Sequence, residues 1–281
     1  MRRIVLTSLA AIVAAAAAAV SAAADGGPSP GVSWGWNGVL APGGQVRYVA
    51  VSDGRRTLVE VVRAQGGRVL RWAWIPGSFG VPFVSVNGGT GGLTRDGRTL
   101  VLASYATAPG PRVATRFAVL GTRRGLRLQS LITLRGSFSF DAVAPDASTL
   151  YLIQYTSARD YNRYRVRAYD LTAQRLVTGA IVDKREPDEA MAGSPIDRAT
   201  TADGRWAYTL YARQGEAPFV HALDTVKREA HCVDLPLRLG LQRQFRLRLD
   251  FRGTNELRVR DGRKTLAVVD VAKLEARRAT S

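Results

Sequence analysis

The side chains best suited to chemistry in this sequence are three aspartates, each in a partly apolar stretch that leads into a turn. Asp141 lies five residues, and Asp197 six residues, before the aspartate that opens the turn, and Asp250 stands at the corresponding place near the C-terminus. Carboxylates that converge can bind a cation such as Ca²⁺ or work as a general acid and base. Because the spacing is unequal, solvated carboxylates without a ligand are the alternative.

A second acidic group lies in the longest polar insertion, residues 183–193. Glu186, Asp188 and Glu189 stand close together there, in a chain that is otherwise basic. Loops of this kind often form binding surfaces. Their spacing fits no EF-hand loop, and a solvated loop is the alternative. With the three aspartates, these residues are the candidates for ligand binding.

Several motifs of enzymes and cofactor proteins are missing from the sequence. The only histidines, His221 and His231, are ten residues apart, and Cys232 is the single cysteine. The glycine-rich run at 87–92 lacks the Lys-Ser/Thr of a P-loop, and residues 77–80 do not fit G-x-S-x-G. The sequence therefore predicts no catalytic residue, no metal site and no cofactor. A divalent cation such as calcium at the candidate carboxylates stays possible, although no motif supports it.

The elements that would position these residues are strands. After residue 31, short β-branched and aromatic runs alternate with Gly, Pro and Asp turns, and helical periodicity is nearly missing. At 245–252, apolar and charged residues alternate, as in a strand with one buried face. The other predicted strands include 46–51, 57–62, 69–75, 99–105, 116–120, 126–134, 149–155, 164–169, 176–182, 207–211 and 266–271.

A turn followed by a strand recurs along the chain. It reads Asp53-Gly54-Arg55, Asp96-Gly97-Arg98 and Asp203-Gly204-Arg205, with a degenerate copy at Asp146-Ala147-Ser148. Asp-Gly suits a tight hairpin because Gly tolerates positive φ and Asp can hydrogen-bond its own backbone. The turns lie roughly 43 to 58 residues apart, which is the length of one four-stranded propeller blade.

One repeat carries a family resemblance. Its turn Ala144-Pro145-Asp146, its strand from Tyr151 and its segment 166–171 resemble a blade of the WD40-like and YVTN (lactonase-type) β-propellers. The Trp-Asp dipeptide of WD40 repeats does not occur, which argues against that branch. The resemblance covers about residues 45–271. It implies blade architecture and leaves the activity open, because propellers serve both binding and catalysis.

We therefore expect an all-β β-propeller of about five four-stranded blades, with a two-sheet sandwich as the alternative. The last blade lacks a clear fourth strand, and residues 31–39 are expected to supply it and close the ring. The innermost strand of each blade would then bring Asp141, Asp197 and Asp250 near the axis. The expected blades are 32–80, 81–137, 138–193, 194–244 and 245–275, followed by a tail at 276–281.

Two pairs of tryptophans alternate along predicted strands. Trp34 and Trp36 form one pair, and Trp72 and Trp74 form the other. Such pairs can stack on sugars, but aromatic side chains more often fill the wedge between propeller blades. We expect packing between blades for both pairs.

The N-terminus has the features of a secretory signal peptide. Met1-Arg2-Arg3 precedes an uncharged run at 4–24, which ends in small residues before the polar linker at 25–31. Cleavage after Ala24 would make the protein secreted or extracytoplasmic. The alternative is an uncleaved membrane anchor through residues 4–24.

Charge narrows the choice of partner only slightly. Lys and Arg number 40 against 23 Asp and Glu, which gives a formal net charge of +17. Such a surface favours polyanions. The arginines are scattered from Arg47 to Arg278, so a generic basic surface is expected rather than a specific nucleic-acid site.

Together these features predict an exported, non-catalytic propeller that serves as a binding scaffold. Its partner would be an envelope or extracellular protein or polymer. Membrane contact would occur only through the leader, residues 4–24, if it is not cleaved. Two alternatives stay open. One is a propeller hydrolase or lactonase that uses channel carboxylates such as Asp141 and Asp197, and the other is a polyanion binder that uses the arginines.

Overall fold

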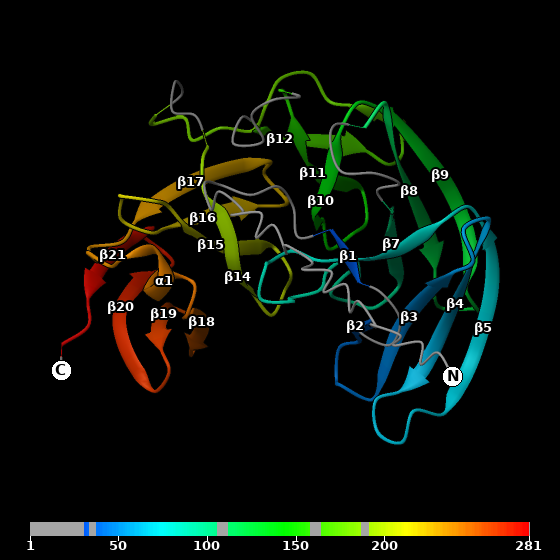
Figure 1. Cartoon of the computed structure of the whole chain (residues 1–281), viewed down its shortest axis with the longest axis horizontal. Coiled ribbons are helices and arrows are strands. Elements are labelled where there is room, and N and C mark those ends of the chain that lie inside the picture. The colour runs from blue at the N-terminus through cyan, green and yellow to red at the C-terminus, as the bar shows by residue number, and fades with distance from the viewer. Residues whose placement is uncertain (1–30, 34–37, 106–111, 158–163, 187–190, 281) are drawn as a thin grey trace, which may run out of the picture.

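Nearly all of the regular secondary structure is strand. The computed structural model describes residues 31–33, 38–105, 112–157, 164–186 and 191–280, and they form five antiparallel sheets arranged as blades around an axis (Figure 1). This is the architecture of a β-propeller, as the spacing of the turns predicts. One short helix, α1 (Leu241–Gln244), precedes the last blade.

Each blade is a meander of four strands, because short turns join successive antiparallel strands. The first blade contains β2 (Val39–Leu40), β3 (Val46–Ser52), β4 (Arg56–Arg63) and β5 (Val69–Pro76). The second contains β6 (Phe79–Pro82), β7 (Thr99–Ser104), β8 (Ala114–Gly121) and β9 (Arg127–Arg135), and β1 (Val32–Ser33) adds to the edge at β6.

The remaining three blades repeat the same meander. The third contains β10 (Phe138–Val143), β11 (Thr149–Tyr155), β12 (Tyr164–Asp170) and β13 (Arg175–Leu176). The fourth contains β14 (Ser194–Thr200), β15 (Trp206–Ala212), β16 (Phe219–Asp224) and β17 (Glu229–Asp234). The fifth contains β18 (Leu247–Arg252), β19 (Glu256–Asp261), β20 (Lys264–Asp270) and β21 (Glu275–Arg278).

The recurring turns have the expected chemistry. The carboxylate of Asp53 accepts hydrogen bonds from the backbone N–H groups of Arg55 and Arg56 at 2.8 and 2.7 Å, and Gly54 has φ +92°. Asp203 accepts in the same way from the N–H of Arg205 at 3.0 Å. The turn's place in the blade varies, however, because the Asp53 turn joins the second and third strands whereas the Asp203 turn joins the first and second.

Apolar side chains from facing blades fill four wedges. One cluster joins the first blade to the second, one joins the second to the third, two join the third to the fourth, and one joins the fourth to the fifth. No such cluster combines the first and fifth blades in the part of the chain that is described. Figure 1 accordingly shows an opening between these two blades.

The expected closure of the ring by residues 31–39 is wrong. Within this segment, β1 pairs with β6 of the second blade, and β2 pairs with β3 of the first. The fourth strand of the last blade is its own β21, which pairs with β20 and extends past the expected boundary at 275. A charged segment, Glu275–Arg278, forms this strand because an outermost strand can face solvent.

Two further expectations fail locally. The strand predicted at 176–182 shrinks to β13, with a single later bridge from Ile181 to Val166, and Gly179 between them has φ +85°. Trp72 and Trp74 do not pack between blades but are 62% and 43% exposed. Trp34 and Trp36 lie outside the described residues, as do the leader and most of the linker. Within the described ranges, no helix has the length and apolarity needed to cross a membrane.

Candidate functional site

The centre of the candidate site is a buried ion pair between two blades. Asp141 lies on β10 and Arg198 on β14, with side chains 3% and 10% exposed. The guanidinium donates one hydrogen bond to the Asp141 carboxylate and another, at 2.7 Å, to the Asp141 backbone carbonyl. Arg198 is therefore held by two acceptors on one residue, and the pair ties the third blade to the fourth.

This pair lines a central cavity of about 410 Å³. That volume lies within the range of roughly 300 to 1,000 Å³ typical of small-molecule sites. Apolar groups such as Val84 and Phe140 supply part of the wall, and Arg95 stands exposed among the lining residues. Strand β2 with the turn that follows it, and the segment 90–95, supply much of the remainder. The cavity thus combines apolar walls with a buried cation at one point.

A loop links the second blade to the fourth and fifth. The backbone N–H of Val86 donates to the carbonyl of Pro195 at 2.8 Å, and the Asn87 amide donates to the carbonyl of Ile196 at 2.6 Å. The same amide reaches the carbonyl of Phe245 at 3.4 Å, just before the fifth blade. The glycine-rich run at 87–92 therefore belongs to a structural bridge between blades.

Close packing explains the glycines at the end of this run. A Cβ atom added to Gly91 would lie 2.6 Å from Val84 and 2.8 Å from the ring of Phe140. Gly92 has φ +92°, and a Cβ there would lie 2.3 Å from the carbonyl oxygen of Val101. Both glycines line the cavity, so its shape depends on the lack of side chains there.

Asp197 does not join Asp141 in a shared site. Its carboxylate accepts a hydrogen bond from the backbone N–H of Leu249 at 2.7 Å and so links β14 to β18. Burial raises the pKa of Asp197, and the backbone hydrogen bonds from Leu249 and Arg198 oppose that rise only in part. The residue fastens the fourth blade to the fifth.

The Asp250 carboxylate forms ion pairs with two arginines of the neighbouring strand β19. Arg258 donates to both of its carboxylate oxygens at 2.9 and 2.7 Å, and Arg260 donates to one of them at 2.9 Å. Partial burial alone would raise the pKa of Asp250, but these arginines outweigh it and lower the pKa. The three predicted aspartates thus lie on first strands of blades, as expected, yet each has a different set of partners.

The acidic loop contains a buried carboxylate that the sequence does not single out. Asp183 is buried and accepts from the Arg185 guanidinium at 2.6 Å and from the backbone N–H of Cys232 at 2.8 Å. Its burial would raise its pKa, but these donors hold it well below the usual range. Glu186 is exposed. Asp188 and Glu189 lie outside the described residues, and no group of three or more metal-ligating side chains occurs among the described ones.

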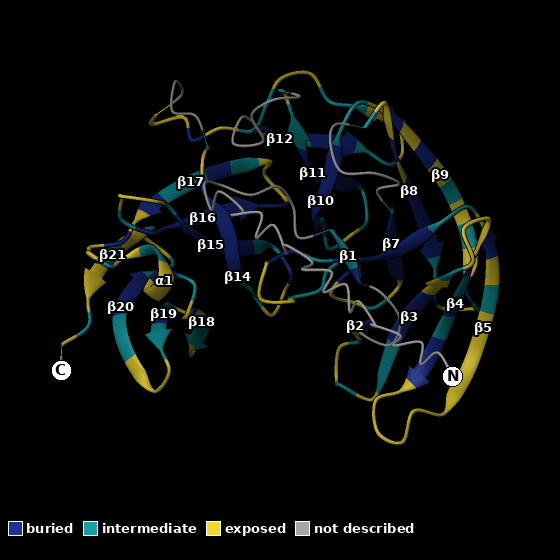
Figure 2. Cartoon of the chain, viewed as in Figure 1, coloured by how far each residue is buried: buried dark blue, intermediate teal, exposed yellow. Residues whose placement is uncertain are grey.

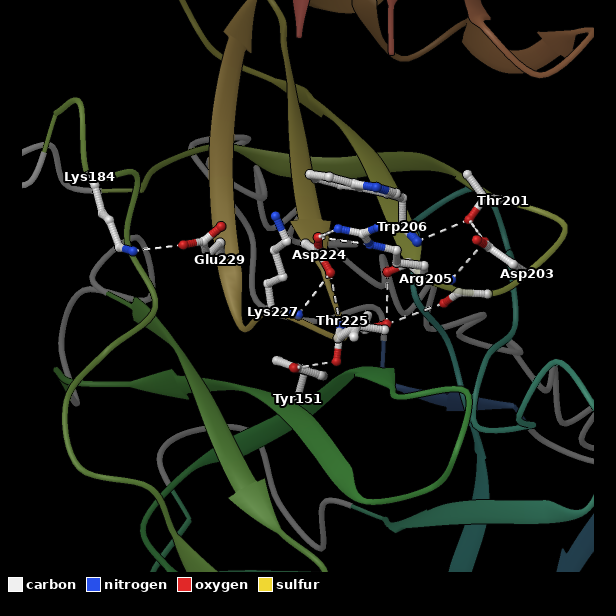
Figure 3. A network of polar contacts seen from close by, with 12 residues as sticks. Tyr151, Lys184, Thr201, Asp203, Arg205, Trp206, Asp224, Thr225, Lys227 and Glu229 are labelled. Carbon is white, nitrogen blue, oxygen red and sulfur yellow. Dashed lines mark hydrogen bonds and ion pairs between the residues drawn. The ribbon is translucent and has the colours of Figure 1, made fainter. Parts of the chain in front are cut away.

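A polar network supports the cavity wall from the fourth blade (Figure 3). Arg205 donates twice to Asp224, at 2.9 and 2.6 Å, and so connects the first turn of the blade to the end of β16. Thr225, which lines the cavity, donates to the carbonyl of Arg205 at 2.8 Å and accepts from the Tyr151 hydroxyl at its own carbonyl at 2.6 Å. The network is structural, since its charges are paired with one another.

Behind Arg198 runs a row of buried polar side chains. Arg198, Thr209 and His221 are cross-strand neighbours on β14, β15 and β16. Arg198 Nε, Thr209 Oγ1 and His221 Nε2 each lack a hydrogen-bond partner within the described structure. Complete burial lowers the pKa of His221 to about 4, so the imidazole is neutral at pH 7. Nothing in the sequence singles out His221 or Arg198, because scattered arginines give no signal that one of them turns inward.

Comparison with known proteins identifies no family. No family model matches the chain, and no curated protein matches it.

Among solved structures, the β-propeller domain of Cps50 (Swd1) from Myceliophteria thermophila is 14% identical, with a TM-score of 0.49, and the alignment covers 86% of this chain and 68% of that one. TolB from Acinetobacter baumannii is 10% identical, with a TM-score of 0.42 and coverages of 82% and 50%. The Dos1 propeller is 12% identical, with a TM-score of 0.44 and coverages of 82% and 56%. The chain thus spans about half to two thirds of the length of these structures, and its fold assignment depends on its own five blades.

Proposed function

We propose that this protein is an exported, non-catalytic β-propeller that binds a partner through its central cavity. The observation that carries the proposal is the cavity of about 410 Å³, whose partly apolar wall contains the largely buried cation Arg198. A guanidinium has five N–H donors, and Asp141 accepts hydrogen bonds from two of them. The group bound there would be a carboxylate or a carbonyl of an envelope or extracellular protein or polymer.

The contacts of the aspartates favour binding over hydrolysis. A general acid and base must be within reach of one substrate. Asp141 is paired with Arg198, Asp197 accepts from the backbone of Leu249, and Asp250 is paired with arginines of β19. These separate roles favour a scaffold rather than a propeller hydrolase or lactonase.

Blocking the cavity tests the proposal. Thr200 is an exposed lining residue, so Thr200→Trp should fill the cavity without disturbing the core. Val113→Trp introduces the same side chain at an exposed position outside the lining residues and is the matched control. A photo-cross-linker at Ala41, which also lines the cavity, should capture an envelope component with the control variant and lose it with Thr200→Trp. Equal capture by both variants would exclude the cavity as the binding site.

Two further measurements address export and catalysis. Fractionation of cells that express the full chain should place it outside the cytoplasm with residues 1–24 removed, and unprocessed protein in the cytoplasm would contradict export. Purified protein should hydrolyse no ester or lactone of a substrate panel. Turnover that disappears in Asp197→Asn, with unfolding unchanged, would favour the hydrolase alternative.

A further inference from the structure

Among the described residues, the first blade shares a hydrophobic cluster with the second blade only. Alternate residues of its strands, such as Val59 and Val61, pack in the cluster shared with the second blade. The residues between them point to the opposite face, which we call the outer face. Register places Trp74 beside Leu58, and Trp72 beside Glu60, on this outer face.

This blade carries an unusual share of exposed apolar side chains. Six of the eleven exposed large hydrophobic residues in the described structure belong to it, although the blade is one of five. Figure 2 shows β5 exposed along most of its length. The six residues are Leu40, Val51, Val69, Leu70, Trp72 and Trp74. None of them belongs to a hydrophobic cluster. A concentration of this kind marks an interaction surface rather than ordinary surface composition.

Cations lie along the same edge of the blade. Arg63 and Arg68 flank the turn between β4 and β5. Arg71 lies on the edge strand β5 and is the register partner of Val61, so it points to the face opposite Trp72 and Trp74. All three arginines are exposed, and none forms an ion pair with a described residue. Residues 39–76 contain six arginines against two acidic residues, so the blade as a whole is cationic.

We propose that this first-blade surface, which consists of the apolar residues Val51, Val69, Leu70, Trp72 and Trp74 and the arginines Arg63, Arg68 and Arg71 at the edge of the blade, docks on an anionic lipid membrane. Leu40 is not part of it, because it lines the cavity. Tryptophan is favoured at membrane interfaces because its ring is apolar and its N–H is polar. Arginines at the same edge of the blade can keep their charges at the headgroups while their stems lie along apolar surface. Each basic residue near an anionic leaflet adds to the attraction. The combination therefore matches the chemistry of an anionic lipid surface on both counts.

Two other occupants match the surface less well. A second copy stacked face to face would bring two cationic blades together, and like charges at an interface are unfavourable. A nucleic acid or another polyanion would satisfy the arginines but would leave the aliphatic residues without a counterpart. Lipid satisfies both parts of the surface at once.

Tryptophan quenching by lipid gives a readout specific to this surface. Residues 4–24 contain no tryptophan, but Trp34 and Trp36 follow them closely, so a variant must separate the signal of Trp72 and Trp74 from theirs. With vesicles of phosphatidylglycerol brominated on the acyl chains, fluorescence of the full chain should fall. The variant Trp72→Phe/Trp74→Phe, which keeps the apolar surface but removes the reporters, should lose most of that quenching. Unchanged quenching in this variant would overturn the proposal.

Matched variants then separate the apolar and cationic contributions to binding. In vesicle flotation, Trp72→Ser/Trp74→Ser should weaken binding at least about tenfold, because two large apolar side chains no longer partition. Val113→Ser/Leu131→Ser removes exposed apolar residues of the second blade and should change little.

The charge test compares two triple variants of equal charge. Arg63→Gln/Arg68→Gln/Arg71→Gln should weaken binding about tenfold or more. Arg123→Gln/Arg124→Gln/Arg127→Gln, which alters exposed arginines of the second blade, should weaken it much less. Equal losses would mean general electrostatic attraction and would contradict a specific surface.

Three further outcomes would also overturn the proposal. One is equal binding to vesicles of phosphatidylcholine alone, and another is tighter binding to a DNA duplex than to phosphatidylglycerol vesicles. The third is a dimer in solution that Trp72→Ser/Trp74→Ser abolishes while vesicles are not bound, which would mean that a second copy covers this face.

Discussion

Arg198 on β14 donates to both the carboxylate and the backbone carbonyl of Asp141 on β10, so one guanidinium joins the first strands of two neighbouring blades. The contact is buried on both sides. It therefore combines two roles, since it fixes the wedge between the third and fourth blades and forms part of the cavity wall.

Breaking this pair from one side should be costly. Arg198→Leu leaves Asp141 as an uncompensated buried charge, and we expect a loss of about 3 to 5 kcal/mol in the free energy of unfolding. Lys184→Met, which removes an exposed ion pair with Glu229, is the control and should cost about 0 to 1 kcal/mol. Urea denaturation measures both. A loss in Arg198→Leu no larger than the control would show that the pair does not hold the blades together.

Asp197 should tolerate loss of its charge but not loss of the oxygen that accepts the hydrogen bond from Leu249. Asp197→Asn can still accept from the N–H of Leu249, so we expect a change within about 1 kcal/mol. Asp197→Leu leaves that N–H without an acceptor and should cost about 1 to 3 kcal/mol. Urea denaturation of the two variants in parallel measures both changes in the free energy of unfolding. If Asn is as damaging as Leu, the negative charge itself is required.

His221 should make stability depend on pH in a defined window. Its folded pKa of about 4 lies below the unfolded value near 6.5, so the unfolded chain takes up a proton first as the pH falls. Its contribution is complete above about pH 6.5 and is lost as the pH falls toward 4, by roughly 3 kcal/mol in total.

The variant His221→Gln should flatten the pH dependence of the unfolding free energy within that window. Val226→Gln places the same side chain at an exposed position and removes no titratable group, so it is the control and should leave the pH dependence unchanged. A wild-type profile that is already flat between pH 6.5 and 4 would contradict the burial of a neutral imidazole.

Gly92 should be far less replaceable than Gly88. Both have positive φ, so an alanine at either site costs about 1 to 3 kcal/mol of backbone strain. At Gly88 a Cβ would meet nothing within 4 Å, whereas at Gly92 it would collide with the carbonyl of Val101. We expect Gly92→Ala to lower the thermal midpoint clearly more than Gly88→Ala. Equal midpoints would mean that the cavity wall can shift at no cost.

Much of the fold is readable from the sequence because it depends on local patterns. The strand at 149–155 is predicted with the bounds that β11 has, and the Asp53 and Asp203 turns use their carboxylates as expected. Spacing between turns also predicts five blades. Hydrophobic alternation and turn chemistry act over a few residues, so one sequence suffices to read them.

The site is less readable because it depends on contacts between distant residues. Asp141 and Arg198 meet across blades, and nothing local to either residue indicates the other. The prediction of ring closure is wrong for a related reason. Strands β1 and β2 are short, so the geometry of whole blades decides which strands they pair with. The exposure of Trp72 is also invisible in its strand pattern, which is the same for a covered face and an uncovered one.

Among the described residues, apolar clusters fill four wedges between five blades, so the blades resemble a linear array. In such an array each unit is stabilised by its own strands and by its immediate neighbours. The terminal units therefore have one neighbour each while the interior ones have two. Fraying should begin at the two ends and move inward, and amide exchange should be slowest in the third blade.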